Sequence, residues 1–160
     1  MSVGFTVVRA QPFHKGHQKI VDKMLKENKT NFLFIGSIDS HDQQNPFSFE
    51  ERKQMITRLY KDETKSKKLI IIGLKDIHNP PKWAKFVTSF MPMKGDCYYC
   101  GTGQDGKLFL NEGYNVSIID RSDLKISGTG IRIKIRSGDN TWKKDVPSKI
   151  HTIIEEKGII

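Results

Sequence analysis

A short segment of the sequence, residues 9–17, brings two histidines together with a lysine and a glycine. A Val-rich apolar run precedes it and helically spaced apolar residues follow it, so we expect a loop that leads into a helix. The free N–H groups and the dipole of a helix N-terminus favour anions. Here Gly16 lets the backbone approach a phosphate, and His14 and His17 can donate N–H groups to its oxygens. The segment predicts a polyphosphate site, with a polar helix start or a zinc-binding His pair as the alternatives.

A second segment with phosphate-binding chemistry lies near the end of the sequence, at residues 127–132. Ser127 is suited to cap the N-terminus of a helix. The backbone N–H groups that follow, the hydroxyls of Ser127 and Thr129 and the guanidinium of Arg132 can bind phosphates from the side opposite the first segment. An ordinary capped helix is the alternative.

Short apolar runs typical of buried strands recur at Val3–Val8 and at residues 32–35, 69–72, 96–100 and 116–119. Helical patterns lie between them: from the first loop to Asn28, over residues 49–60 behind a Ser48/Glu51 capping box, from Pro80 through Phe90, and at residues 108–111. Two further helices are expected to begin near Ser127 and near Pro147.

This alternation of strands and helices predicts one α/β domain over residues 1–160, a Rossmann-like parallel sheet with helices on both faces. Ligands bind such sheets beyond the carboxyl ends of the strands, where the strand order reverses. The loop after the first strand is therefore the favoured place for the chemistry.

Composition limits the function classes. The 27 Lys and Arg residues against 18 Asp and Glu give a net charge of +9, which attracts phosphates. The lysines are dispersed and no RNA-binding aromatic signature accompanies them, so nucleic acid is not the expected partner. No apolar run approaches the roughly 20 residues of a membrane helix, and the first ten residues resemble a strand rather than a signal sequence. We expect a cytoplasmic protein without a membrane partner.

The two cysteines, Cys97 and Cys100, lie in one predicted strand. Three steps along a strand span roughly 10 Å, which is too far for a disulfide. Buried thiols are the simpler interpretation, and a redox or zinc site is the alternative.

The first segment contains His-x-Gly-His and resembles the signature of the nucleotidylyltransferase superfamily; in full, as Arg9-Ala10-Gln11-Pro12-Phe13-His14-Lys15-Gly16-His17, it is similar to archaeal-type nicotinamide mononucleotide adenylyltransferases. The second segment resembles that family's Ser-[Ser/Thr/Gly]-Thr-x-x-Arg signature, which in relatives binds the ATP phosphates. The chain differs from the family pattern at Val8, Ala10, Gln44 and Gly130.

The resemblance implies transfer of AMP from ATP, carried with Mg²⁺, to nicotinamide mononucleotide, which yields NAD and pyrophosphate. The implied catalytic residues are His14, Lys15, His17 and Arg132. The implied ATP-binding residues are Arg9, Gln11, Phe13, His14, Gly16, His17, Ser127, Gly128, Thr129 and Arg132. The implied residues for the acceptor are Gly36, Ser37, Phe47, Asp76, Ile77 and Trp83, whose indole suits a pyridinium ring but could equally belong to the core.

A phosphate nucleophile is ionised at neutral pH, so the implied reaction depends on positioning and electrostatic stabilisation rather than on a strong base. No Asp-rich cluster suggests a metal site in the protein, so Mg²⁺ is expected to accompany the triphosphate. Other superfamily enzymes, which use phosphopantetheine or glycerol 3-phosphate, and a non-catalytic nucleotide- or nucleic-acid-binding protein are the alternatives. The sequence leaves the oligomeric state open, a homo-oligomer included.

Overall fold

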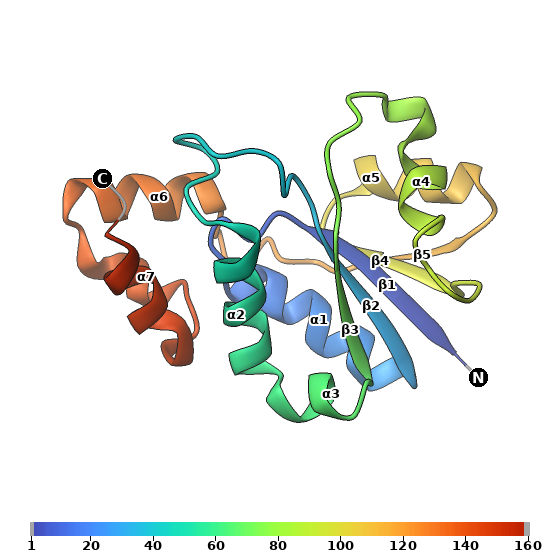
Figure 1. Ribbon diagram of the computed structural model, residues 1–160, viewed down its shortest axis with the longest axis horizontal. Helices are drawn as coiled ribbons and strands as arrows, with labels where there is room; N and C mark the ends of the chain where they lie inside the picture. Colours follow the sequence, from blue (N-terminus) through green and yellow to red (C-terminus); the bar gives the residue numbers. More distant parts are fainter. Residues whose placement is uncertain (1, 159–160) are drawn as a thin grey trace.

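A computed structural model describes residues 2–158 and contains a five-stranded parallel sheet with the strand order β3-β2-β1-β4-β5 (Figure 1). The strands are β1 (Val3–Val8), β2 (Thr30–Ile35), β3 (Leu69–Gly73), β4 (Cys97–Cys100) and β5 (Asn115–Ile118). The chain adds β2 and β3 on one side of β1 and then crosses to add β4 and β5 on the other. The strand order therefore reverses between β1 and β4, which places the expected ligand crevice at their carboxyl ends.

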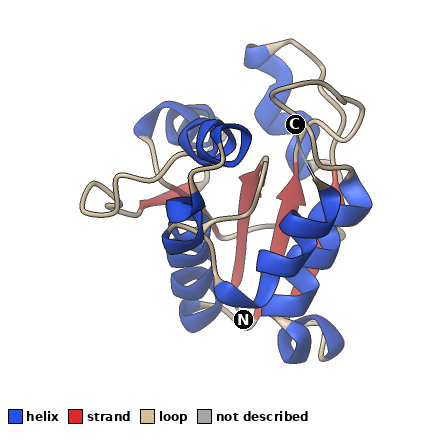
Figure 2. Cartoon of the chain, turned by 90° about the vertical axis from the view of Figure 1, so that its left-hand side faces the viewer, coloured by secondary structure: helices blue, strands red, loops and turns tan. Residues whose placement is uncertain are grey.

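Helices cover both faces of the sheet, as Figure 2 shows. They are α1 (Lys15–Glu27), α2 (Phe49–Leu59), α3 (Lys61–Lys65), α4 (Pro80–Thr88), α5 (Gly103–Asn111), α6 (Gly128–Ser137) and α7 (His151–Lys157), with 3₁₀ turns at Asn140–Lys144 and Ser148–Ile150. The expected Rossmann-like α/β architecture is confirmed.

Two apolar clusters form the core, one on each side of the sheet. The apolar faces of α1, α2, α6 and α7 join the first cluster, where Val21, Met55 and Ile131 are almost fully buried. Helices α4 and α5 close the second cluster, in which Phe5 and Phe109 are fully buried. Strand side chains bury against both layers, which explains the continuous apolar runs of the strands in the sequence. Within residues 2–158, each helix is too short or too polar to cross a bilayer.

Two helices differ from expectation. Helix α5 begins at Gly103, five residues before the expected start, because Gly103 and Gly106 interrupt the apolar pattern. Gly106 is needed for close packing, since a Cβ there would lie 2.9 Å from Val116 Cγ1. Helix α3 (Lys61–Lys65) was not predicted because it buries none of its residues and so has no apolar pattern.

Candidate active site

The loop after β1 enters α1 through a reciprocal cap made by two imidazoles. His14 Nδ1 accepts hydrogen bonds from the backbone N–H groups of Gly16 (3.1 Å) and His17 (3.4 Å), and His17 Nδ1 accepts from the N–H of His14 (3.2 Å). The rings stack with their centroids 3.7 Å apart. Because both Nδ1 atoms are acceptors, a neutral ring carries its proton on Nε2, which remains available as a donor.

The surroundings keep both rings neutral at neutral pH. Burial, and secondarily the charge of Arg121, lowers the pKa of His14 from 6.5 to about 4, although Asp145 acts in the opposite direction. Burial also lowers the pKa of His17 well below its usual value, with further contributions from His14 and Arg121. Neutral imidazoles can stack at this distance without charge repulsion.

The second segment starts α6 and meets the first. Ser127 is the N-cap, and its Oγ accepts a hydrogen bond from the N–H of Gly130 at 3.0 Å. The buried guanidinium of Arg132 donates from Nη1 to the carbonyl of Gln11 (2.7 Å) and from Nη2 to Thr129 Oγ1 (3.3 Å). Arg132 therefore joins the start of α6 directly to the loop after β1.

Together the two segments line a cavity of about 150 Å³, here called the loop cavity. Its walls contain imidazole, hydroxyl, guanidinium and backbone groups but no carboxylate. The lining residues are Arg9, Ala10, Gln11, His14, His17, Gly128, Thr129 and Arg132. Two hydrogen-bonding segments more than 100 residues apart in sequence thus form one site suited to an anion.

Three of the residues predicted to bind ligands have side chains that are held by contacts within the fold. Gln11 Nε2 donates to the carbonyl of Phe47 at 2.9 Å, and Gln11 Oε1 accepts from the N–H of Phe47 at 2.8 Å. Phe13 and Phe47 have no exposed surface and belong to the core. Core packing and this amide pair thus engage the side chains of Phe13, Phe47 and Gln11, and the predicted contacts of these residues with ligands stay a prediction.

Two basic residues of the first segment lie at its surface. Lys15 is the exposed first residue of α1 and does not line the loop cavity. Arg9 is exposed and its Nη2 donates to Asn45 Oδ1 at 2.5 Å, which ties it to the loop after β2.

Arg52, which the sequence analysis did not single out, holds the loops after β1 and β2 in place. Its side chain is fully buried, and Nη1 donates to the carbonyls of Arg9 (2.9 Å) and Gly36 (2.7 Å). Nε donates to the carbonyl of Ser48 (3.2 Å) and Nη2 to that of Ser37 (3.4 Å). Burial and nearby Arg9 lower the pKa of Arg52 to about 10, so it remains charged at neutral pH.

Arg121 is a second residue missed in the sequence. Its guanidinium lies over the backbone of Gly101, where a Cβ would be 2.2 Å from Nε and Nη2. It also approaches the start of α1, since a Cβ at Gly16 would lie 3.2 Å from its Nη1. Arg121 comes just after the last predicted strand. In a parallel sheet this position lies at the same edge as the other loops, so it could have indicated that Arg121 belongs to the site.

A larger cavity of about 380 Å³, here called the sheet-edge cavity, lies at the carboxyl ends of β1, β2 and β4 and shares Arg9 and His17 with the loop cavity. It brings together four residues predicted for the acceptor, namely Gly36, Ser37, Asp76 and Trp83. Ser37 Oγ donates to Asp76 Oδ1 at 2.9 Å.

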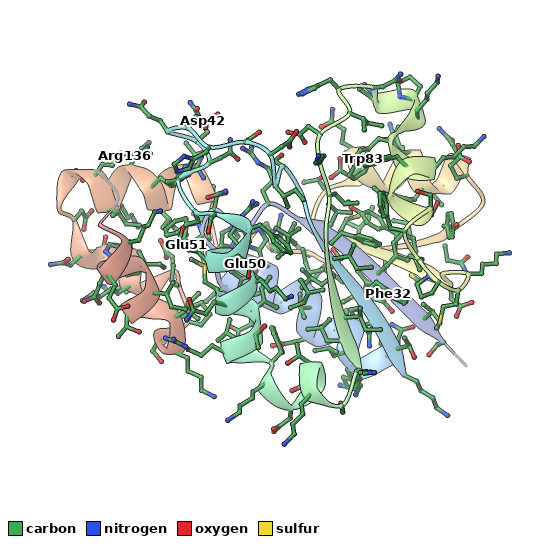
Figure 3. The ribbon with its side chains drawn as sticks, viewed as in Figure 1. Phe32, Asp42, Glu50, Glu51, Trp83 and Arg136 are labelled. Atoms are coloured by element: carbon green, nitrogen blue, oxygen red, sulfur yellow. The ribbon has the colours of Figure 1, made fainter. Side chains whose placement is uncertain are left out.

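The remaining predicted acceptor residue, Ile77, lines a third cavity of about 260 Å³ between α4 and α5, here called the α4–α5 cavity. Trp83, labelled in Figure 3, lies on α4 with its ring 5.4 Å from that of Phe109 on α5 in an edge-to-face arrangement. Asp76, Trp83 and Asp105 line both this cavity and the sheet-edge cavity. The two cavities therefore adjoin at the indole.

Comparisons with known proteins agree with this fold. The family model of the citrate lyase ligase C-terminal domain matches residues 3–75. Among solved structures, a bifunctional NMN adenylyltransferase/ADP ribose pyrophosphatase from Francisella tularensis is 24% identical with a TM-score of 0.69, and the match covers 86% of this chain and 42% of that one. A structure of such an enzyme from the same organism, complexed with AMP and a Mn ion, has a TM-score of 0.70 at 22% identity and is covered over 52% of its length. The chain thus spans about half of each of these longer proteins.

Curated relatives match over most of both chains. The nicotinamide-nucleotide adenylyltransferase of Picrophilus torridus is 36% identical, with 95% of this chain and 89% of the relative covered. Those of Thermoplasma acidophilum and Archaeoglobus fulgidus are 34% and 35% identical, with 84% and 90% of the relative covered. The chain belongs to the nicotinamide-nucleotide adenylyltransferase family.

Proposed function

We propose that this protein transfers AMP from ATP to nicotinamide mononucleotide, which yields NAD and pyrophosphate. The observation that supports the proposal best is the loop cavity, in which the His14/His17 helix start and the Ser127 helix start meet without a carboxylate. It adjoins the sheet-edge cavity, which contains Trp83 and could receive the acceptor. Family membership supports the same activity.

In the proposed reaction, a phosphate oxygen of the acceptor attacks the α-phosphorus of ATP in line with the leaving group. The new oxygen–phosphorus bond forms as the bond to the β-phosphate bridging oxygen breaks, and pyrophosphate leaves. The attacking oxygen is already ionised, so the protein need not remove a proton. Its contribution is orientation and stabilisation of the developing charge.

We assign this stabilisation to the Nε2–H groups of His14 and His17, which are neutral donors beside the loop cavity. Arg132 and Thr129 would bind the triphosphate together with the N–H groups at the start of α6. Arg9 and Arg121 lie at the edges and supply positive charge. Lys15 would act only as a nearby charge, because its side chain is exposed.

We assign the acceptor to the sheet-edge cavity. Trp83 offers an aromatic face to the pyridinium ring, and Gly36, Ser37, Asp76 and Ile77 would surround the rest of the nucleotide.

We propose that Mg²⁺ arrives with the triphosphate as part of the substrate. Residues 2–158 contain no group of three or more His, Cys, Asp or Glu side chains placed to hold a metal ion. The lining of the loop cavity has no carboxylate that could bind Mg²⁺ directly, so the cation would be held by the oxygens of the triphosphate.

Purified protein with magnesium should be assayed against nicotinamide mononucleotide, nicotinate mononucleotide, phosphopantetheine and glycerol 3-phosphate, each with ATP and with CTP. We expect NAD and pyrophosphate from nicotinamide mononucleotide and ATP. A preference for phosphopantetheine, glycerol 3-phosphate or CTP would overturn the substrate assignment and leave nucleotidyl transfer intact. No turnover with any pair would instead favour a binding protein without catalysis.

A further inference from the structure

The α4–α5 cavity contains two carboxylates beside an indole and no lysine or arginine. Asp76 comes from the loop after β3, Trp83 from the first half of α4, and Asp105 from the first turn of α5. The arginines and the lysine of the adjoining sheet-edge cavity are Arg9, Lys75 and Arg121, and none of them lines the α4–α5 cavity. The cations thus line only the sheet-edge cavity, whereas the two carboxylates lie with the indole where the two cavities adjoin.

The two carboxylates differ in their hydrogen-bonding partners within the protein. Asp76 accepts hydrogen bonds from Ser37 Oγ (2.9 Å) and Ser40 Oγ (3.5 Å). Asp105 has no hydrogen-bonding or ion-pair partner for its carboxylate anywhere in the described chain, residues 2–158. The dipole of α5 favours an acidic residue in its first turn, but it does not require that the carboxylate face a cavity.

Asp105 lines both the α4–α5 cavity and the sheet-edge cavity, which places it where the two adjoin. The pKa values of Tyr98 and Cys100 on β4 are raised mainly by burial and additionally by the negative charge of Asp105. Both residues line the sheet-edge cavity, so the carboxylate is close to that lining. Although Asp105 is exposed as a residue, partial burial raises the pKa of its own carboxyl group. A partly solvated carboxylate without a partner at this place is available for a modest interaction with a charged ligand.

On the basis of the proposed function, we propose that Asp105 makes the site select nicotinamide mononucleotide over nicotinate mononucleotide. The nicotinamide nucleotide presents a cationic pyridinium ring with a neutral carboxamide. The nicotinate nucleotide has the same ring with a carboxylate, which would lie in a cavity that already contains two carboxylates. Attraction to the first ligand and repulsion of the second act in the same direction, which is how a binding site separates two similar ligands.

The test compares kcat/KM for the two mononucleotides, with ATP saturating, in the wild type and in Asp105→Asn. We expect the wild type to prefer the nicotinamide nucleotide and Asp105→Asn to reduce this preference about tenfold, the scale of one partly solvated charge pair. The change should appear in the KM values of the mononucleotides and leave the KM for ATP unaltered. Asp105→Glu retains the charge and should retain the preference.

Glu112→Gln is a matched control, because Glu112 is the C-cap of the same helix and lines neither cavity. An unchanged preference in Asp105→Asn, or an equal change in Glu112→Gln, would overturn the role of Asp105. Loss of the preference in Asp105→Glu would also overturn it, since the charge is retained. If the wild type used neither mononucleotide, the proposed function itself would fail; turnover of both with a ratio insensitive to Asp105 would refute only this inference.

Discussion

The role of Arg121 can be tested without replacing Arg121, because its guanidinium lies against Gly101 and the substitution Gly101→Ala would displace it. A Cβ at Gly101 would lie 2.2 Å from Arg121 Nε and Nη2, whereas ordinary contact begins at 3.4 Å, so Gly101→Ala must displace the guanidinium by about 1.2 Å. Gly101 is not among the positive-φ glycines, so its backbone accepts alanine. The displaced group is the far end of a flexible side chain, and we expect the free energy of unfolding to change by less than about 1 kcal/mol.

The expected cost is kinetic, because a misplacement of about 1 Å in a site that depends on positioning reduces the rate roughly a hundredfold. NAD formation should be measured for Gly101→Ala, for Arg121→Ala and for the double variant. Since the three atoms nearest to the new Cβ all belong to Arg121, the double variant should be no slower than Arg121→Ala. Gly103→Ala is the matched control, because a Cβ there meets only Ile118 Cδ1 at 3.7 Å. Near-wild-type turnover in Gly101→Ala, or losses that multiply in the double variant, would refute the reasoning.

His17→Ala should reduce turnover by about a hundredfold or more while far-UV circular dichroism stays unchanged, because one preorganised donor is lost; near-normal turnover would exclude that role. Arg52→Met should lower the free energy of unfolding in urea by about 2–5 kcal/mol, since it removes the guanidinium that donates to four backbone carbonyls, and a loss below 1 kcal/mol would contradict this. Burial lowers the pKa of His14 from 6.5 to about 4, so the unfolded chain binds more protons in this interval, and stability should fall by roughly 3 kcal/mol as the pH drops through it. His14→Asn should remove the contribution of His14 and leave that of His17, whose pKa is also lowered, and an unchanged slope would contradict the assignment.

The order of strands and helices could be predicted because each element has a periodic apolar pattern or a local cap. The Ser48/Glu51 capping box is present, with Ser48 N donating to Glu51 Oε1 at 2.8 Å and Glu51 N donating to Ser48 Oγ at 3.1 Å. Such signals involve residues three or four positions apart, so they can be recognised without knowing the fold. The early start of α5 could not be recognised, since Gly106 is present for contact with Val116, a residue of the next strand.

The candidate site could be predicted where its residues form contiguous segments and not where single residues contribute from elsewhere in the sequence. The His14/His17 and Ser127 helix starts are visible as motifs, but their meeting depends on the contact of Arg132 with the Gln11 carbonyl. Arg121 belongs to no motif and reaches the site only through the parallel arrangement of the strands. The burial of Phe13 could not be predicted either, since an aromatic residue inside such a segment can have no exposed surface.

Under the proposed function, the histidine pair would let one site bind the nucleotide and favour the later stages of the reaction. With Arg121 near and the rings buried, the pKa values of His14 and His17 are lowered, so both begin as neutral donors. A bound triphosphate opposes the influence of Arg121 and should raise both pKa values. Negative charge grows on the leaving pyrophosphate as its bond to the α-phosphorus breaks, so donation from Nε2 strengthens at that stage. Groups that interact more strongly with the transition state than with the bound substrate accelerate the reaction, whereas a permanent cation at the same place would bind both states tightly.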